Sequence, residues 1–433
     1  MLKSRQMSIR VRISPSSTGF AHVGTAYISL FNYAFAKKNK GKFILRIEDT
    51  DIKRHVPKAE KAIFAGLHWL GLNYDEGPDV GGKFGPYRQS ERTNLYQKYA
   101  QELLEKKLAY QDEGAIRFKV PQGKTSWQDL IRGEISFDNG QIEDFVILRS
   151  NGYPVYNFAV VIDDWLMKIS HVIRGEDHIS NTPRQIMLYQ VLGAKVPEFA
   201  HLPLLRNPDQ SKISKRKNLV ALSWYQKQGY LPEAMVNFFG LMGWSHPKDK
   251  TVFSLDEFIK YFSFKRVSTS APVFDLRKLD WLNGVYLREK TDKELLQLIK
   301  QYAPKGMSDT LIKQTVPLIK DRLIKLSDYP DLIDFFIKEP KVDRKLLIKK
   351  SQGEKLLKEQ FEKSIIELEK NKVWEAKRLE KLFRDLVRKN NWHTGKYFMA
   401  TRITLTGKTA TPPLFETMAL IGKEKTLKRL KQI

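Results

Sequence analysis

The sequence predicts an α/β fold with a doubly wound parallel sheet, followed by an all-helical C-terminal half. Three observations lead to this prediction. Residues 10–47 follow the order strand, loop, helix, strand; an α/β pattern returns after Gly152; and from Thr291 onward apolar residues recur at helical spacing. Ligands of doubly wound sheets bind beyond the carboxyl ends of the strands, so we expect a binding site near the first loop.

Residues 10–47 contain the clearest pattern in the chain. Val11 and Ile13 alternate with arginines, which is typical of a strand, and residues 14–19 are rich in Ser, Pro, Thr and Gly and interrupt it. A helix is expected next, with Thr25 as its cap, and a second strand over 43–47. Five apolar residues share the helical face: Tyr27, Leu30, Phe31, Ala34 and Phe35. The loop and the helix N-terminus offer N–H groups to a phosphate.

The rest of the first half is expected to alternate helices and short strands. Helices are predicted over 57–70, 85–107, 182–192 and 229–244. Strands are predicted over 116–120, 142–148, 158–162, 169–173 and 199–205. From residue 291 onward the expected helices include 311–326, 356–368, 373–388, 414–421 and 426–430. This last region is basic, a property that is more often generic than specific.

Composition limits the classes of protein that fit. With 433 residues, two to four domains are expected. The 75 Lys and Arg exceed the 49 Asp and Glu, which gives a formal charge of +26 and favours a polyanionic partner or, alternatively, a basic solvated surface. The chain has no Cys, which excludes disulfides, thiolate metal sites and a Cys nucleophile. No apolar run of about 18 residues predicts a membrane span, and no signal peptide is evident, so we expect a cytoplasmic protein that starts at Met1 or Met7.

Several motifs occur in a specific order. PSSTGFAHVGT covers residues 15–25, RIEDTD 46–51, GPYRQSER 85–92 and KISKR 212–216. A lone histidine or a lone basic pentamer usually carries no function, but the two end motifs are separated by nearly two hundred residues with a returning α/β pattern between them. In this order they resemble the HIGH and KMSKS motifs of class I aminoacyl-tRNA synthetases. The resemblance is to bacterial and organellar glutamyl-tRNA synthetases, although Ser17 stands where that family usually has Pro.

The resemblance implies five segments. They are the first half of a Rossmann-like catalytic domain at 1–84, an inserted α+β module for the tRNA acceptor end at 85–151, and the second catalytic half at 152–210. A KMSKS loop with a helical connector would follow at 211–290, and a helical anticodon-binding region at 291–433. The inserted module is shorter than in most family members and lacks the Cys of their zinc site.

The resemblance also implies a reaction, in which ATP activates L-glutamate to glutamyl-adenylate and the glutamyl group passes to the terminal adenosine of tRNA(Glu). Family positions give the catalytic residues as His22, Gly24, Thr25, Lys212 and Lys215. ATP would contact Ser16, His22, Gly24, Asp177, Leu205, Lys212, Ile213, Ser214, Lys215 and Arg216. Glutamate would contact Arg12, Ser14, Ser16, Glu48, Tyr156 and Arg174. Arg322 would read an anticodon base.

Charge chemistry agrees with these implied roles. A substrate carboxylate is best bound by a bidentate Arg, and cations on a loop can neutralise a departing pyrophosphate. The ordinary alternatives are a surface cation for Arg12 and a solvated strand end or helix cap for Glu48 and Asp49. Two acidic pairs, Asp163–Asp164 and Glu176–Asp177, could suggest a metal site, but we expect structural hydrogen bonds, with Asp177 near ATP.

The expected partners are tRNA(Glu), ATP and L-glutamate, with tRNA(Gln) left open. We expect Mg²⁺ carried by ATP, no zinc, no membrane association and a monomer. Three alternatives were weighed. A glutaminyl relative would continue into a β-barrel module, a catalytically silent RNA-binding paralogue would have lost His22 or Lys215, and a tRNA-modifying relative would lack the helical half.

Overall fold

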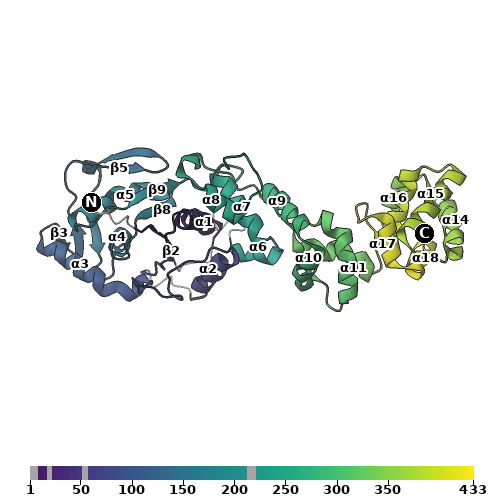
Figure 1. The fold of residues 1–433 in the computed structure, drawn as a ribbon, viewed down its shortest axis with the longest axis horizontal. Helices are drawn as coiled ribbons and strands as arrows, with labels where there is room; N and C mark the ends of the chain where they lie inside the picture. The colour runs from purple at the N-terminus through teal and green to yellow at the C-terminus, as the bar shows by residue number, and fades with distance from the viewer. Residues whose placement is uncertain (1–7, 17–21, 51–56, 212–220) are drawn as a thin grey trace, which may run out of the picture. The chain divides into compact units, whose positions relative to one another are not determined.

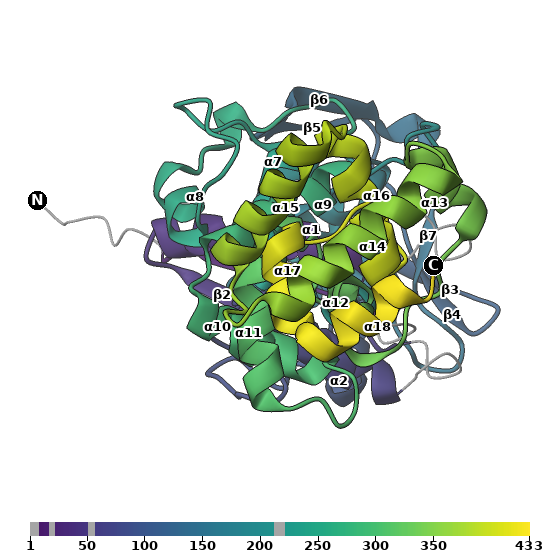
Figure 2. The same ribbon diagram turned by 90° about the vertical axis from the view of Figure 1, so that its right-hand side faces the viewer.

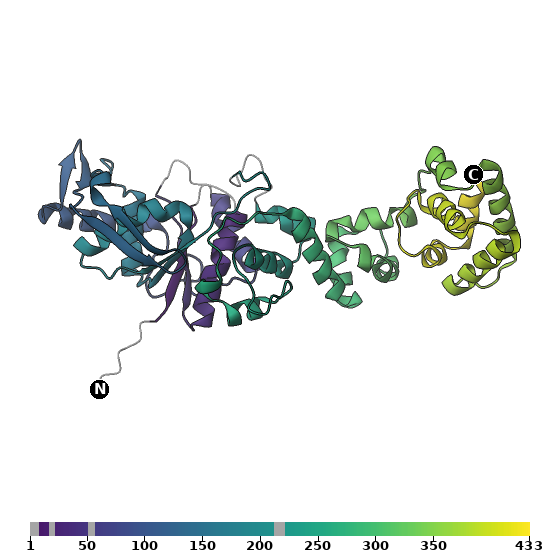
Figure 3. The same cartoon turned by 90° about the horizontal axis from the view of Figure 1, so that it is seen from above.

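The computed structural model describes residues 8–16, 22–50, 57–211 and 221–433. The chain forms two compact units, Met1–Leu282 and Asn283–Ile433. In the described residues every strand belongs to the first unit, while the second contains only helices and short helical turns (Figures 1 and 3). The predicted fold class, an α/β sheet protein with an all-helical C-terminal half, is confirmed.

The first unit begins with the predicted strand–helix–strand arrangement. Strands β1 (Arg10–Ile13) and β2 (Lys42–Leu45) are parallel, with Val11 opposite Phe43, and α1 (Val23–Lys38) connects them. Four of the five predicted face residues of α1 are buried, and Phe35 is partly buried. One expectation is wrong: α1 begins at Val23, so Thr25 lies within its first turn, and His22 occupies the cap position without a side-chain cap bond.

The first unit also contains a four-stranded mixed sheet. Its order is β6 (Gly133–Asp138), β5 (Lys124–Asp129), β9 (Glu198–Leu202) and β8 (His171–Gly175). Strands β5 and β8 both run parallel to β9, and β6 is antiparallel to β5. The two sheets approach each other where Ser170 N donates to Arg10 O at 2.9 Å. This bond joins the amino-terminal ends of β1 and β8, and the last residues of the two strands, Ile13 and Gly175, line one pocket.

The segment 158–162 was predicted as a strand, and this is wrong. It lies in α4 (Tyr156–Leu166), where all five residues are buried. A continuous apolar run has neither the period of a strand nor that of an amphipathic helix, so periodicity could not decide between them. Together with α3 (Thr93–Glu105) and α5 (Thr182–Val191), α4 contributes to an apolar core that also includes Ile44 and Phe199.

The segment between residues 85 and 151 contributes to two sheets. A 3₁₀ turn (Gln89–Arg92) leads into α3, and β3 (Ala109–Asp112), β4 (Ala115–Phe118) and β7 (Phe145–Leu148) form a separate antiparallel sheet. The β5–β6 hairpin instead extends the sheet of β8 and β9 through the pairing of Asp129 with Phe199. The boundaries of an inserted module stay a prediction.

Helices complete the first unit. The helix α2 (Pro57–Trp69) follows the first strand pair, and α6 (Leu222–Gln228), α7 (Pro232–Gly243) and α8 (Leu255–Tyr261) follow β9. Phe31 of α1 makes edge-to-face contacts with Phe258 and Phe262, with ring centroids 5.7 and 5.8 Å apart. These contacts join α1 to α8 and fix the helix whose N-terminus faces the site.

The regular elements among the described residues of the second unit are all helices or short helical turns. The helix α9 (Leu276–Glu289) crosses the boundary between the units, and nine further helices follow. In Figure 2, α14 packs against α15, α16 and α18, and α15 packs against α17. The helices after α9 are α10 (Asp292–Ile299), α11 (Asp309–Ile319), α12 (Tyr329–Ile337), α13 (Arg344–Lys350), α14 (Glu354–Lys370), α15 (Ala376–Asn390), α16 (Thr394–Thr406), α17 (Leu414–Ile421) and α18 (Lys423–Lys431). No helix among the described residues is both long and apolar enough to span a bilayer.

Candidate active site

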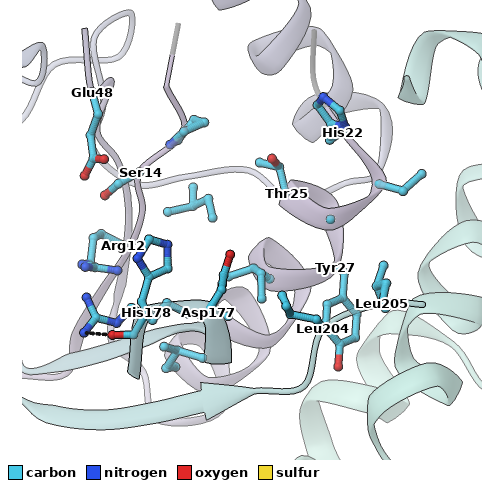
Figure 4. Close-up of a pocket in the computed structure, with 18 of the residues that line it drawn as sticks. Arg12, Ser14, His22, Thr25, Tyr27, Glu48, Asp177, His178, Leu204 and Leu205 are labelled. Carbon is cyan, nitrogen blue, oxygen red and sulfur yellow. Dashed lines mark hydrogen bonds between the residues drawn. The ribbon is translucent and has the colours of Figure 1, made fainter. Parts of the chain in front are cut away.

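A pocket of about 320 Å³ opens where β1 and β8 end and α1 begins. In Figure 4, Arg12, Ser14 and Glu48 line one side of this pocket, and His22 and Thr25 lie on the other. Ten of the residues predicted for substrate binding or catalysis line it: Arg12, Ser14, His22, Gly24, Thr25, Glu48, Tyr156, Arg174, Asp177 and Leu205. Residues from six separate segments of the chain thus meet in one cavity.

The first turn of α1 forms one wall of the pocket. It contains Gly24 and Thr25 and no acidic side chain, and His22 precedes it. The space where Gly24 would carry a Cβ is open, because no described residue outside the local helix backbone has an atom within 4 Å of it. A ligand can therefore approach the backbone N–H groups at this helix end, where the helix dipole favours an anion.

Buried ion pairs hold the opposite wall in place. Arg12 Nε lies 3.1 Å from both carboxylate oxygens of Asp164, and Arg46 Nη1 lies 2.6 Å from Asp164 Oδ1. Arg46 Nη2 also contacts Glu48 Oε1 at 3.3 Å. Burial opposes ionisation of Asp164, but Arg12 and Arg46 bring the pKa of Asp164 below its usual value. This arrangement uses only the Nε side of Arg12 among the described residues and leaves its two terminal amino groups for the pocket.

Asp163 extends the same network away from the pocket. It accepts from Arg92 Nε at 2.6 Å and from Gln89 Nε2 at 2.8 Å, both in the GPYRQSER motif. The hydroxyl of Tyr96 contacts both of its oxygens. Three buried arginines and three carboxylates therefore balance one another in the cluster of Arg12, Arg46, Arg92, Glu48, Asp163 and Asp164. The expected structural role of Asp163 and Asp164 agrees with these contacts.

Glu48 differs from the other two carboxylates of this cluster, Asp163 and Asp164, because it lines the pocket. Its side chain is 13% exposed, and burial raises its pKa, while Arg46 and Arg12 oppose that shift. The adjacent Asp49 faces elsewhere and accepts from Ser90 N at 2.8 Å, which holds the start of the 3₁₀ turn at Gln89–Arg92. Of these two acidic residues, only Glu48 lines the pocket.

Arg174 is a second buried cation of the pocket. Its described side-chain partners are all neutral: Nε contacts His201 Nε2 at 3.2 Å, Nη1 contacts Gln185 Oε1 at 2.8 Å and Nη2 contacts Thr182 Oγ1 at 2.8 Å. Burial lowers the pKa of Arg174 from its ordinary value. A buried cation held by neutral groups has unsatisfied attraction for an anion.

Sequence reasoning missed two residues of the pocket that carry polar groups, His178 and Tyr27. His178 Nδ1 lies 3.2 Å from the hydroxyl of Tyr156, and burial, followed by the charge of Arg174, lowers the pKa of His178 to about 4. His178 is thus a neutral neighbour of the pocket. Its position directly after Glu176–Asp177 was the only available signal. Tyr27 belongs to the predicted apolar face of α1 and is buried.

Two further residues, Ser16, which was predicted for the pocket, and Glu176, which was predicted to be structural, lie outside the pocket. Ser16 does not line the pocket, although its backbone bridges to Glu48. Glu176 pairs with Arg132 and accepts from Leu204 N at 2.9 Å, which is a structural role. The predicted loop residues Lys212, Ile213, Ser214, Lys215 and Arg216 lie outside the described residues. Within the described ranges, no group of three or more His, Asp or Glu is arranged to hold a metal ion.

Arg322 belongs to the helical unit. It is exposed and ends a 3₁₀ turn (Lys320–Arg322). Burial, and then the nearby charge of Arg322, lowers the pKa of Arg402. Arg402 is held by carbonyl groups, with Nη1 at 2.8 Å from Pro412 O. Arg322 and Arg402 are therefore two like charges near each other on this unit. Neither has a carboxylate among its described contacts.

Comparison with known proteins identifies the class. Residues 8–115 and 112–281 match the family described as class I tRNA synthetases (E and Q), catalytic domain, and residues 294–433 match an anticodon binding domain. The chain therefore belongs to the class I tRNA synthetases of the E and Q type. The predicted aminoacyl-tRNA synthetase activity class is confirmed.

Individual relatives narrow the comparison. Glutamate–tRNA ligase of Thermus thermophilus is 43% identical, over 97% of this chain and 98% of the relative. Glutamate–tRNA ligase 2 of Thermosipho melanesiensis is 42% identical, over 98% of each. A crystal structure of a glutamate tRNA ligase from Elizabethkingia meningosepticum in complex with its amino acid is 30% identical, with a TM-score of 0.90, and covers 98% of this chain and 99% of that one. The predicted resemblance to glutamyl-tRNA synthetases is confirmed.

Proposed function

We propose that this chain is a glutamate–tRNA ligase that uses the pocket between β1, β8 and α1 to form glutamyl-adenylate. The observation that carries the proposal is the pairing of two features across one cavity. A helix N-terminus with open space at Gly24 lies on one side, and two buried arginines lie on the other. The first suits phosphates and the second suits a dicarboxylic amino acid.

Glutamate recognition would use Arg12 and Arg174 together. The two terminal amino groups of Arg12 have the fork geometry that a carboxylate accepts, while Asp164 holds the Nε side. Arg174 supplies a second positive charge without a carboxylate partner among its described contacts. Glu48 would accept the α-ammonium, because an ammonium beside it stabilises its charged form. Tyr156 and Ser14 would hydrogen-bond the substrate, and Ser16 would act through the backbone near Glu48.

Activation would occur at the start of α1. A carboxylate oxygen of glutamate attacks the α-phosphorus of ATP, and the bond to the β-phosphate breaks as pyrophosphate leaves. His22 would donate to a phosphate oxygen, Gly24 and Thr25 would present backbone N–H groups, and Asp177 and Leu205 would lie beside the nucleotide. Lys212 and Lys215, on the loop with Ile213, Ser214 and Arg216, would neutralise the departing pyrophosphate. A hydroxyl of the terminal tRNA adenosine then attacks the acyl carbon and releases AMP.

A Mg²⁺ ion would arrive with ATP and would be held mainly by the phosphates of ATP. No cluster of three metal-binding side chains occurs among the described residues, and Mg²⁺ commonly binds through substrate phosphates and water. Bound in this way, it supplies positive charge to the phosphates. We also propose that the protein binds no zinc and is a monomer. Its proposed location is the cytoplasm, where the tRNA and ATP of this reaction occur.

The helical unit would supply tRNA binding and anticodon choice. Its match to an anticodon binding domain supports this assignment, and Arg322 is our candidate for reading a base. An exposed Arg next to Arg402 can stack on or hydrogen-bond an unpaired base.

The test is ATP-dependent attachment of labelled glutamate to purified tRNA(Glu) and, separately, to tRNA(Gln). Attachment to tRNA(Glu) that requires ATP is expected, with glutamine and aspartate as inactive controls. Attachment of glutamine in place of glutamate would contradict the proposed substrate. Failure to attach any of the three amino acids to either tRNA would contradict the proposed reaction. The result with tRNA(Gln) decides whether one or two tRNAs are substrates.

A further inference from the structure

A buried Asp–His pair lies behind Arg174. Asp129 ends β5 and His201 lies on β9, and these strands run parallel (Figure 1). His201 Nδ1 is 2.6 Å from Asp129 Oδ2, and His201 Nε2 is 3.2 Å from Arg174 Nε. Asp129 is 2% exposed and His201 is completely buried, and neither lines the pocket. The pair can influence the pocket only through Arg174 and the residues around it.

The contacts define which nitrogen of His201 carries the proton. Arg174 Nε–H can only donate, so His201 Nε2 must accept and be unprotonated. The single proton of the neutral ring is then on Nδ1, where it is donated to Asp129. Burial lowers the pKa of His201, against the hydrogen bond to Asp129, which raises it. Thr182 Oγ1 also lies 3.2 Å from Nε2, but it has an alternative acceptor in His178 O at 3.2 Å.

The two oxygens of Asp129 have separate tasks. Oδ1 accepts from three backbone N–H groups, those of Ile131 at 3.0 Å, Arg132 at 3.1 Å and His201 at 3.2 Å. Oδ2 contacts His201 Nδ1. Burial opposes the charge, but these bonds, led by that from His201, lower the pKa of Asp129. The backbone thus fixes the orientation of the carboxylate, and the carboxylate in turn fixes the tautomer of His201.

We propose that Asp129 and His201 are positioning residues that orient Arg174 toward the bound amino acid by holding His201 in its Nδ1–H tautomer. This inference rests on the proposed function, because Arg174 is taken to contact glutamate. The β5–β6 hairpin therefore contributes to amino-acid binding without touching the amino acid. The guanidinium keeps Nη1 and Nη2 aimed by Gln185 and Thr182 while Nε is held by His201.

Asp129→Asn tests the proposal with almost no change in shape. The amide oxygen can keep the three backbone bonds of Oδ1, which directs the NH₂ group at His201 Nδ1. That nitrogen must then accept, so the ring proton moves to Nε2 and opposes Arg174 Nε–H. We expect the KM for glutamate in tRNA aminoacylation to rise at least about tenfold, the loss of one charge-assisted bond, while the KM for ATP stays within about twofold.

Asp138→Asn is the matched control. Asp138 lies on β6 of the same hairpin, is exposed, and accepts only from Gly140 N in its described side-chain contacts, at 2.9 Å. It should leave both KM values unchanged. An unchanged KM for glutamate in Asp129→Asn, or an equal rise in the KM values for glutamate and ATP, would overturn the proposal. If the wild-type protein attaches glutamate to tRNA in the same assay, such a result contradicts only this inference. The proposed function then stands.

Ring-nitrogen NMR of the wild-type protein provides a second measurement that does not depend on the folding of Asp129→Asn. In wild-type protein labelled with ¹⁵N-histidine, the His201 signal, assigned from its loss in His201→Gln, should show a protonated Nδ1 and an unprotonated Nε2 near neutral pH. A protonated Nε2 in the wild type would overturn the proposal. In Asp129→Asn the pattern should reverse.

Discussion

Two sets of arginines, one from each unit of this chain, use positive charge in opposite ways. In the first unit, Arg12, Arg46 and Arg92 have side chains that are at most 5% exposed, and each contacts a buried carboxylate. In the second, Arg344 and Arg388 are 64% and 76% exposed, and their partners Glu354 and Asp385 are exposed as well. Buried charges interact at short range with little screening, whereas exposed charges are screened within about 10 Å at roughly 0.1 M salt.

The buried arginines and the exposed cations therefore have two different roles. The buried arginines fix the wall of a pocket that distinguishes small substrates, because removing one leaves an uncompensated charge. The exposed cations contribute little to folding but add to the field that attracts a polyanion. The net charge of +26 therefore does not measure the charge that a partner meets. Part of the positive charge is neutralised by carboxylates in the interior, and part remains exposed for a partner.

The largest expected effect is on folding, from Arg46→Met. Arg46 is completely buried between Asp164, Glu48 and Asp163, and the variant removes the cation that these three carboxylates share. We expect the free energy of unfolding of the first unit to fall by roughly 3–5 kcal/mol. Urea denaturation followed by tryptophan fluorescence measures it.

Arg344→Met is the matched control for that experiment. Its ion pair with Glu354 is exposed, so the unfolding free energy of the second unit should change by less than about 1 kcal/mol. Equal losses in the two variants would show that burial does not separate the two sets of cations.

Substrate recognition can be tested on two arginines of the same strand. Arg12→Leu should raise the KM for glutamate by a factor that corresponds to roughly 2–5 kcal/mol, because it removes a charge-assisted pair at a buried site. Arg10 lies two residues earlier and pairs with Glu76 at 2.7 Å, outside the pocket. Arg10→Leu should lower stability and leave the KM for glutamate of the folded enzyme unchanged. Parallel changes in the two KM values would refute the role of Arg12.

A smaller effect is expected for anticodon choice. Arg322→Gln should change the preference between tRNA(Glu) and tRNA(Gln) by about 1–3 kcal/mol if Arg322 reads a base. Lys325, which pairs with Asp328 at 3.2 Å, is the control, and Lys325→Ala should weaken both tRNAs slightly and alike. Steady-state kcat/KM values for the two tRNAs measure both effects. If Arg322→Gln also weakens both tRNAs equally, Arg322 is a phosphate contact.

The sequence predicted many of the elements from local patterns, and the resemblance to a known family predicted half of the residues that line the pocket, ten of twenty. It did not predict that 158–162 is helical, since a fully buried segment shows no amphipathic period. It also gave no sign of contacts between distant residues. Arg12 contacts Asp164, which is 152 residues away in the sequence, and His201 contacts Asp129, which is 72 residues away. No pattern in a single sequence predicts such pairs. His178 belonged to a recognised segment but had no distinguishing neighbour.

The different roles of the buried and the exposed cations are tested most directly by the salt dependence of two KM values in one aminoacylation assay. Between roughly 50 and 200 mM potassium chloride, the KM for tRNA should rise at least about tenfold, because exposed cations release counterions from the phosphates they contact. The KM for glutamate should change by less than about twofold, because its binding groups are buried and weakly screened. A parallel rise of both KM values, or a KM for tRNA that salt does not change, would contradict the account.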